Sequence, residues 1–446
     1  MISKLSVLAF ILTLALDYKS DQSGGTIWQY AVAGIAASTV ALNVLLLPPI
    51  WHSLSTWVRR AILLGGLFLV CSVGVARLHD VPWDNYGRMV LPIFLLWGGF
   101  IIAVGVLRSP DGVQWLTKVL LVGAIVNAIW SVYAALFIKD LEMATIRFQL
   151  SSMGLDMLFA YALTRLLLDR GSMWMPFGIL LVVFTVQAMT ITRSYVLVWM
   201  VLLGVVTYMA MRLRRSRIIA PIPVAGVLLT ATVFALFAML ALGVLENRYS
   251  TLTRWSERIV SKAQDRAILD VSFALRIAED RGMLAALSEE PTNFLLGRGF
   301  GSSFNLDRQY FFSNVSTDLY KGEYLDRVFM GVWQKPDTTW VPIIHDGGVF
   351  FLGLFMLFYW QPLRAGWRAL LDPALPPSLR KALLWTVVMM ILWVTPSLLG
   401  NILFMRFTCG VMGVVVAIAA TSIAIPRRIQ APAPGPDGSF SSRIHP

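Results

Sequence analysis

Long runs of apolar residues, separated by short polar segments, recur along most of the chain. A run of about 18 or more apolar residues can cross the hydrocarbon of a bilayer as one helix. About twelve runs approach or reach this length: residues 5–16, 27–48, 61–77, 89–107, 116–138, 153–168, 173–190, 194–211, 218–244, 341–360, 382–403 and 406–425. The pattern therefore predicts an all-α polytopic membrane protein with about twelve transmembrane helices.

One long segment, residues 246–340, interrupts this pattern and carries charges of both signs. A set of apolar positions inside it follows helical spacing and predicts a helix: Val271, Ala274, Ile277, Met283 and Leu287. Long ordered segments between helices are usually functional. We therefore expect transmembrane helices in 1–245 and 341–425, a helical catalytic or acceptor-binding loop in 246–340, and a disordered Pro- and Ser-rich tail in 426–446.

The charges bear on orientation. Only 14% of residues are charged and the net charge is +12, but the cations lie in short loops, where they indicate topology and contact with anionic lipid rather than nucleic-acid binding. The densest cluster, Arg212–Arg217, is expected in the cytoplasm. Counting spans from it places both termini in the cytoplasm and residues 246–340 on the outer side. The same count puts further cations on the cytoplasmic side: Arg59, Arg60, Arg108, Arg165, Arg170, Arg364, Arg368, Arg380, Lys381, Arg427 and Arg428.

The sequence offers few residues for catalysis. It contains no GxSxG, HExxH or Walker-type motif, and its two cysteines, Cys71 and Cys409, lie in apolar runs, so we expect no metal site and no cofactor. The four histidines are His52, His79, His345 and His445. Arginines stand out on the outer side instead: Arg147, Arg193, Arg276, Arg281 and Arg298. The guanidinium fork suits a phosphate or diphosphate, whereas the alternative is that each arginine anchors a helix end in lipid headgroups.

A glycine-rich loop lies in the middle of the long segment. In GRGFG, Gly297, Gly299 and Gly301 alternate with Arg298 and Phe300. Glycines let backbone amides approach an anion closely, and Arg298 would add charge. The alternative is a simple turn.

The stretch SFALRIAEDRGMLAALSEEPTNFLLGRGFGSSF, together with TRSYVL and IRFQLSSMGLDMLFAYAL, resembles the O-antigen ligase and Wzy-type polymerase superfamily of bacterial envelope proteins. Arg276, Pro291 and Gly297–Gly301 occupy the places of the family's arginine, proline and glycine-rich loop, and Arg193 and Arg147 match two earlier arginines. The resemblance implies a GT-C-like fold in the bacterial inner membrane with its active face in the periplasm. The implied activity transfers an oligosaccharide from undecaprenyl diphosphate to an acceptor glycan or to lipid A core.

The resemblance also implies roles for residues. Arg193 and Arg276 would bind the diphosphate, and Arg276 would also act in catalysis. Arg147 and Arg298 would assist in binding or positioning it. The favoured base that deprotonates the attacking hydroxyl is Asp337, which lies at the family's spacing from Gly348; the alternative is His345, which lies closer to the glycines.

The sub-function depends on a departure from the family. Its ligases carry a histidine followed by asparagine near the end of the loop, and this pair is absent here. We therefore expect a polymerase, with a ligase as the alternative and a membrane transporter as the alternative of another class. Expected partners are the lipid-linked oligosaccharide, the acceptor, membrane lipids and a chain-length regulator protein, and no nucleic acid.

Overall fold

The computed structural model describes residues 2–17, 27–109, 111–134, 137, 152–168, 174–189, 193–214, 271–314, 332–333, 339–397 and 405–423. Within these residues the chain is helical apart from two strands of two residues each. The elements are α1 (Ile2–Ala15), α2 (Ile27–Leu45), the 3-10 helix η1 (Pro48–Ser53), α3 (Thr56–Leu78), α4 (Trp83–Val106), α5 (Gly112–Tyr133), α7 (Met153–Leu168), α8 (Trp174–Met189), α9 (Arg193–Arg214), α12 (Val271–Ser288), α13 (Pro291–Leu296), β1 (Phe304–Asn305), α14 (Arg308–Asn314), β2 (Val332–Trp333), α16 (Trp340–Leu370), α17 (Pro377–Ser397) and α18 (Arg406–Thr421).

Six of these helices are long and apolar enough to cross a membrane: α2, α3, α4, α5, α16 and α17. The prediction of a multi-pass helical membrane protein is therefore confirmed. A helix is present at every predicted span that falls within the described residues, and α1, α8 and α18 include shorter apolar stretches. The predicted span 218–244 lies outside those residues. Apolar runs specify helices so directly because a backbone in lipid must satisfy its own hydrogen bonds.

Small residues bring the bundle helices together. A side chain on Gly99 of α4 would overlap the carbonyl of Gly410 in α18, and one on Gly413 would overlap the carbonyl of Leu96. Such backbone contact is typical of helix pairs in membranes. The side chain of Asn127 in α5 adds a polar link, since it donates to the carbonyl of Ala15 and accepts from the amide of Gly154, both at 3.0 Å.

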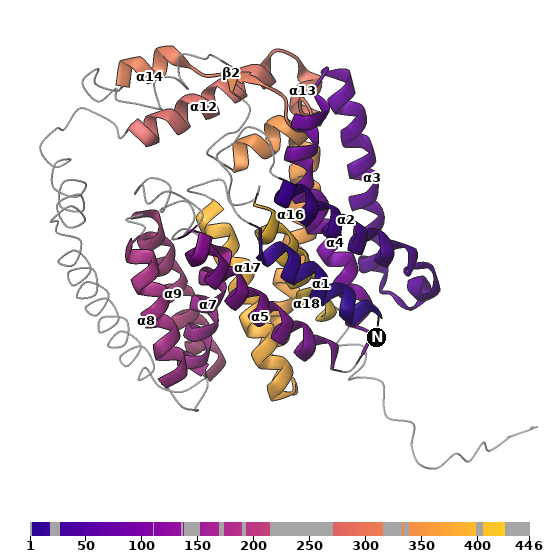
Figure 1. Cartoon of the computed structure of the whole chain (residues 1–446), viewed down its shortest axis with the longest axis vertical. Helices are drawn as coiled ribbons and strands as arrows, with labels where there is room; N and C mark the ends of the chain where they lie inside the picture. Colours follow the sequence, from indigo (N-terminus) through magenta and orange to yellow (C-terminus); the bar gives the residue numbers. More distant parts are fainter. Residues whose placement is uncertain are drawn as a thin grey trace, which may run out of the picture.

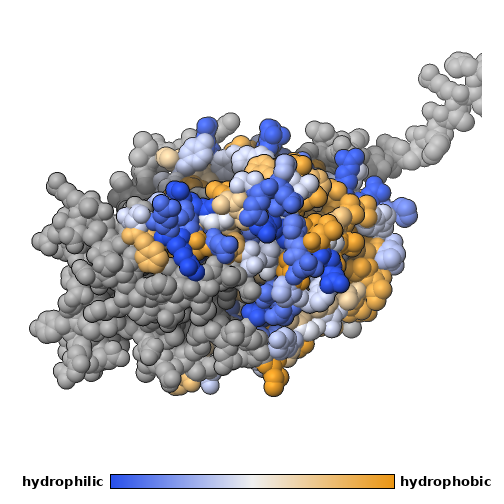
Figure 2. Space-filling model, turned by 90° about the horizontal axis from the view of Figure 1, so that it is seen from above, coloured by the Kyte–Doolittle hydropathy of each residue, from blue (hydrophilic) through white to orange (hydrophobic). Residues whose placement is uncertain are grey.

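The elements α12, α13, β1, α14 and β2 lie together at one end of the bundle, and we call them the cap (Figure 1). Helix α12 confirms the predicted helix, with Ala274, Met283 and Leu287 buried. Strand β1 pairs antiparallel with β2, Phe304 opposite Trp333. Seen from above, hydrophilic residues gather on the described part of the cap and hydrophobic residues on the flank of the bundle (Figure 2).

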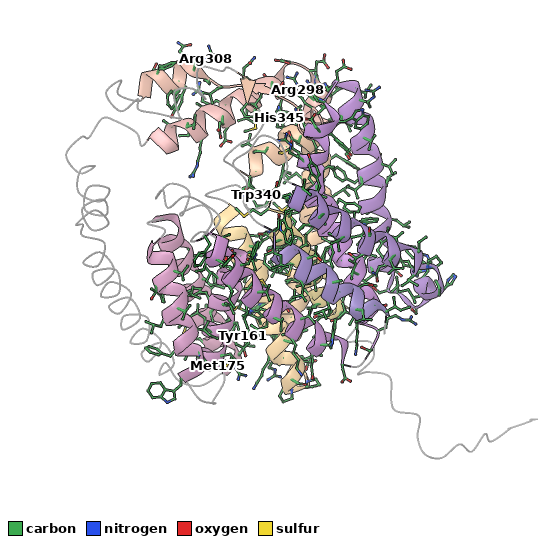
Figure 3. All side chains as sticks on the ribbon, viewed as in Figure 1. Tyr161, Met175, Arg298, Arg308, Trp340 and His345 are labelled. Carbon is green, nitrogen blue, oxygen red and sulfur yellow. The ribbon has the colours of Figure 1, made fainter. Side chains whose placement is uncertain are left out.

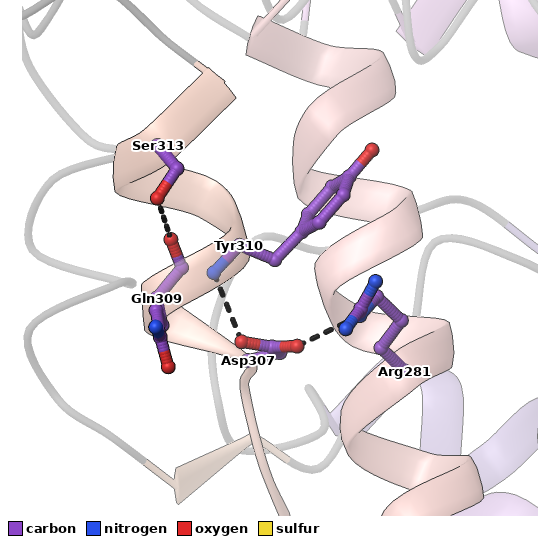
Figure 4. Close-up of polar contacts among 5 residues, drawn as sticks. All are labelled: Arg281, Asp307, Gln309, Tyr310 and Ser313. Atoms are coloured by element: carbon purple, nitrogen blue, oxygen red, sulfur yellow. Dashed lines mark hydrogen bonds and ion pairs between the residues drawn. The ribbon is translucent and has the colours of Figure 1, made fainter.

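The carboxylate of Asp307 links two helices of the cap (Figure 4). Asp307 accepts from Nε of Arg281 at 2.8 Å and from the amide of Tyr310 at 3.0 Å. The guanidinium of Arg281 also lies over the Tyr310 ring, 4.8 Å from its centre. Arg281 therefore joins α12 to α14.

Candidate functional site

The site is set by a break in α16. Gly348 has φ 70° and ψ 176°, so the helix is interrupted there. The residues before the break, Trp340 to Gly347, form a short arm beneath the cap, and they carry His345 and Asp346 (Figure 3). Both side chains are buried, with 1% and 5% of their surface exposed.

His345 and Asp346 form a hydrogen-bonded pair. Nδ1 of His345 lies 2.8 Å from Oδ1 of Asp346, and the amide of Gly301 also hydrogen-bonds the Asp346 carboxylate. Nε2 of His345 is buried and has no hydrogen-bond partner among the described residues. A carboxylate at Nδ1 favours the tautomer with its proton on Nδ1, which leaves the lone pair on Nε2. This is the arrangement of a base and the group that orients it.

The glycine-rich loop packs its backbone against this arm. The amide of Arg298 donates to the carbonyl of His345 at 2.7 Å, and the amide of Gly299 to that of Asp346 at 3.0 Å. Gly297, Gly299 and Gly301 all have positive φ, between 78° and 90°. The amides of Arg298 and Gly299 are directed at α16, so the geometry does not support the expected role of the loop as a backbone cradle for an anion.

The glycines also allow contact with the bundle. A Cβ on Gly297 would lie 2.5 Å from the carbonyl of Asp346, one on Gly299 would lie 2.7 Å from Cα of Ala76 in α3, and one on Gly301 would lie 2.6 Å from the backbone of Asn85 in α4. Only glycine fits at such separations. We call this set of backbone contacts the glycine clasp.

An aromatic cluster supports the clasp. Phe300 is buried and meets Phe68 of α3 and Phe351 of α16 edge to face, at centroid distances of 5.8 and 5.6 Å. Phe68 and Phe351 stack at 4.1 Å. The Phe300 ring therefore packs between α3 and α16, and this packing helps to position the arm that carries His345.

Charged groups surround the pair. Nη1 of Arg298 lies 3.0 Å from Oε2 of Glu289, so this predicted diphosphate ligand is ion-paired within the cap. His79, at the end of α3, also belongs to the site. Burial lowers the pKa of His79, the nearby Arg298 lowers it further, and Glu290 opposes them. His79 therefore favours its neutral form next to the cap.

The other predicted site residues are described in part. Arg276 lies half-buried on α12, and Arg193 begins α9, although its side chain lies outside the described residues. Arg147 and Asp337 lie outside the described residues altogether. Their convergence on a diphosphate, and the role of Asp337 as the base, stay predictions.

Two members of the site were not predicted. Asp346 follows His345 directly in the sequence, but neighbouring residues on a helix do not normally face each other, so the dipeptide gave little signal. His79 is far from the loop in sequence, and its only signal was a histidine at the end of an apolar run.

The chain matches no family model, and no curated protein matches it. The family named by the resemblance therefore stays a prediction.

Proposed function

We propose that the chain is a membrane glycosyltransferase that polymerises undecaprenyl-diphosphate-linked oligosaccharide repeat units at the periplasmic face of the bacterial inner membrane. One observation carries the proposal: His345 is oriented by Asp346, keeps Nε2 without a partner among the described residues, and lies next to Arg298. This pair is hydrogen-bonded to the glycine-rich loop, which belongs to the stretch that carries the family resemblance.

The proposed reaction needs a base and a stabilised leaving group. Nε2 of His345 takes the proton from a hydroxyl of the acceptor sugar, the oxygen forms a bond to the anomeric carbon of the donor, and the bond from that carbon to the diphosphate breaks. The diphosphate leaves with the electron pair, and arginine side chains stabilise its charge. A positioned general base typically contributes about 10²- to 10⁴-fold to the rate.

Access to the base sets a condition on this mechanism. Nε2 of His345 is buried in the structure, so a sugar hydroxyl reaches it only when the cap and the arm of α16 separate locally. Segments that open in this way are common in enzymes that exclude water from the reaction. The proposal therefore requires a motion of the cap during each cycle.

The test is the surface-glycan ladder of cells that carry His345→Ala, Asp337→Ala or the control His52→Ala, with protein levels checked. His52 is exposed in η1, so its loss should leave the ladder unchanged. We expect His345→Ala to reduce long glycans to a single repeat on lipid A core. Loss of long glycans in Asp337→Ala alone would transfer the role of base to that residue.

Other outcomes separate the alternatives. Long chains that accumulate on the lipid carrier would identify a ligase. An unchanged ladder in both variants, with normal protein levels, would contradict a base at either position and would favour a transporter.

A further inference from the structure

Helix α13 presents three consecutive large apolar side chains at the surface of the cap. Phe294, Leu295 and Leu296 are 50%, 58% and 50% exposed. Such a run on a hydrophilic domain marks a surface that meets an apolar partner. Neither the proposed reaction nor the packing of the cap uses these side chains.

The segment that carries them is held in a fixed shape. The ion pair between Glu289 and Arg298 joins the residues on either side of α13. The amide of Gly297 donates to the carbonyl of Asn293 at 2.8 Å, and Asn293 is buried. The exposed apolar side chains therefore belong to an ordered projection.

The position of α13 along the bundle indicates what it meets. The backbone of Leu295 packs directly against Gly348, at the break in α16. Beyond that break, Phe350, Leu357 and Trp360 are exposed, and their spacing places them on one face of α16. Helix α16 is a candidate span, so this exposed apolar face is turned to lipid.

Contacts with helix α3 also indicate where α13 lies relative to the ends of the apolar spans. Gly299, three residues after α13, lies against Ala76 in the last turn of the candidate span Thr56–Leu78, and Leu78 is exposed. Helix α13 therefore lies level with the ends of two apolar helices.

We infer that α13 is an interfacial anchor whose apolar side chains insert among the acyl chains of the leaflet next to the cap. The occupant is the bilayer itself, because the backbone of α13 contacts α16 at Gly348, where the part of this apolar span that exposes Phe350, Leu357 and Trp360 begins. Apolar side chains beside charged groups are the composition of segments that lie in the membrane interface. The inference does not depend on the proposed function.

The anchor has a consequence for the site. The loop that follows α13 is bonded through Arg298 and Gly299 to the arm that carries His345. An anchored α13 therefore holds His345 and Asp346 at the surface of the membrane, where the head of a lipid-linked molecule would lie.

The test measures depth with a nitroxide in proteoliposomes. Cys71 and Cys409 are first replaced by alanine, and one cysteine is then introduced as Leu295→Cys or Phe294→Cys. Leu357→Cys on the lipid-facing stripe and Ser288→Cys at the exposed end of α12 are the references. Collision of the label with oxygen reports lipid, and collision with a water-soluble nickel chelate reports water.

We expect the ratio of oxygen to nickel accessibility at positions 294 and 295 to match that at 357 and to exceed the ratio at 288 several-fold. A ratio like that at position 288 would overturn the inference, since α13 would then lie in water. Low access to both reagents would also overturn it and would indicate that a second copy or another protein covers α13.

Discussion

At the scale of single residues, the chemistry of the site depends on which nitrogen of His345 carries the proton. The Asp346 carboxylate lies at Nδ1, 2.8 Å away, and the amide of Gly301 also hydrogen-bonds that carboxylate. In the proposed reaction Asp346 is thus a positioning residue, which would act on substrate only through His345.

Asp346→Asn should retain the bond from the Gly301 amide but present a neutral group to Nδ1. The side-chain amide of asparagine does not select one tautomer of His345. We therefore expect kcat for the proposed glycosyl transfer to fall by roughly 10²- to 10⁴-fold while KM changes little. Purified protein with a lipid-linked oligosaccharide would be assayed for both constants. A lower midpoint of thermal unfolding, with kcat per folded molecule unchanged, would show that Asp346 has a purely structural role.

A methyl group at Gly348 should disrupt the clasp. The backbone there has φ 70° and ψ 176°, and an added Cβ would overlap the carbonyl of Leu295. We expect Gly348→Ala to lower the free energy of unfolding by roughly 3 kcal/mol or more. Gly353→Ala is the matched control on the same helix, because nothing lies within 4 Å of its added Cβ. Thermal unfolding in detergent would compare them, and equal midpoints would contradict the steric argument.

Residue chemistry was the part least accessible from sequence. The pattern selected Gly297–Gly301 and His345, but it could not show which carbonyls would accept from the amides of Arg298 and Gly299. The acceptors belong to His345 and Asp346, more than 40 residues further along the chain. A GxGxG run is compatible with an anion or with backbone packing, and only the tertiary contacts decide between them.

At the scale of elements, apolar runs predicted the helices well. In lipid the backbone of a single segment can satisfy its own hydrogen bonds only as a helix. The spacing of Val271, Ala274 and Ile277 likewise predicted α12. The break in α16 was not predicted, although His345, Asp346, Gly347 and Gly348 interrupt the apolar run where the break lies. The predicted start of that span at residue 341 placed His345 within a straight helix rather than on a separate arm.

The junction of α12 and α14 depends on Asp307. We expect Asp307→Ala to speed hydrogen exchange of the amides in residues 308–314 by roughly tenfold, equal to about 1.4 kcal/mol, because a helix cap and an exposed ion pair are both lost. Ser313→Ala is the control, since it removes only the local bond to the carbonyl of Gln309. Equal exchange in the two variants would show that other contacts hold α14.

At the scale of the whole molecule, the described cations of α3, α16 and α17 lie mainly at the helix ends away from the cap. The cap contacts the end of α3 and the break near the start of α16. The other end therefore carries the start of α3, the end of α16 and the start of α17, where six cations lie: Arg59, Arg60, Arg364, Arg368, Arg380 and Lys381. This distribution matches the positive-inside pattern and supports a cap outside the cytoplasm.

Labelling in intact cells tests this orientation. Ser303→Cys in the cap and Ser378→Cys at the start of α17 both place a thiol at an exposed position. With the native cysteines replaced, an impermeant maleimide should label position 303 in cells with a permeabilised outer membrane, and position 378 only after lysis. Labelling of 378 before lysis, with 303 protected, would reverse the orientation.

The glycine clasp also has a consequence for biosynthesis. Its parts are made at widely separated times, since Ala76 and Asn85 precede the loop and the arm of α16 follows it. Contacts between distant parts of a chain form late, and membrane segments emerge in order from the N-terminus. A nascent chain that ends before residue 345 has the α3–α4 hairpin and the loop but lacks the carbonyls that the loop binds. The ribosome must therefore complete about three quarters of the protein before this site can assemble.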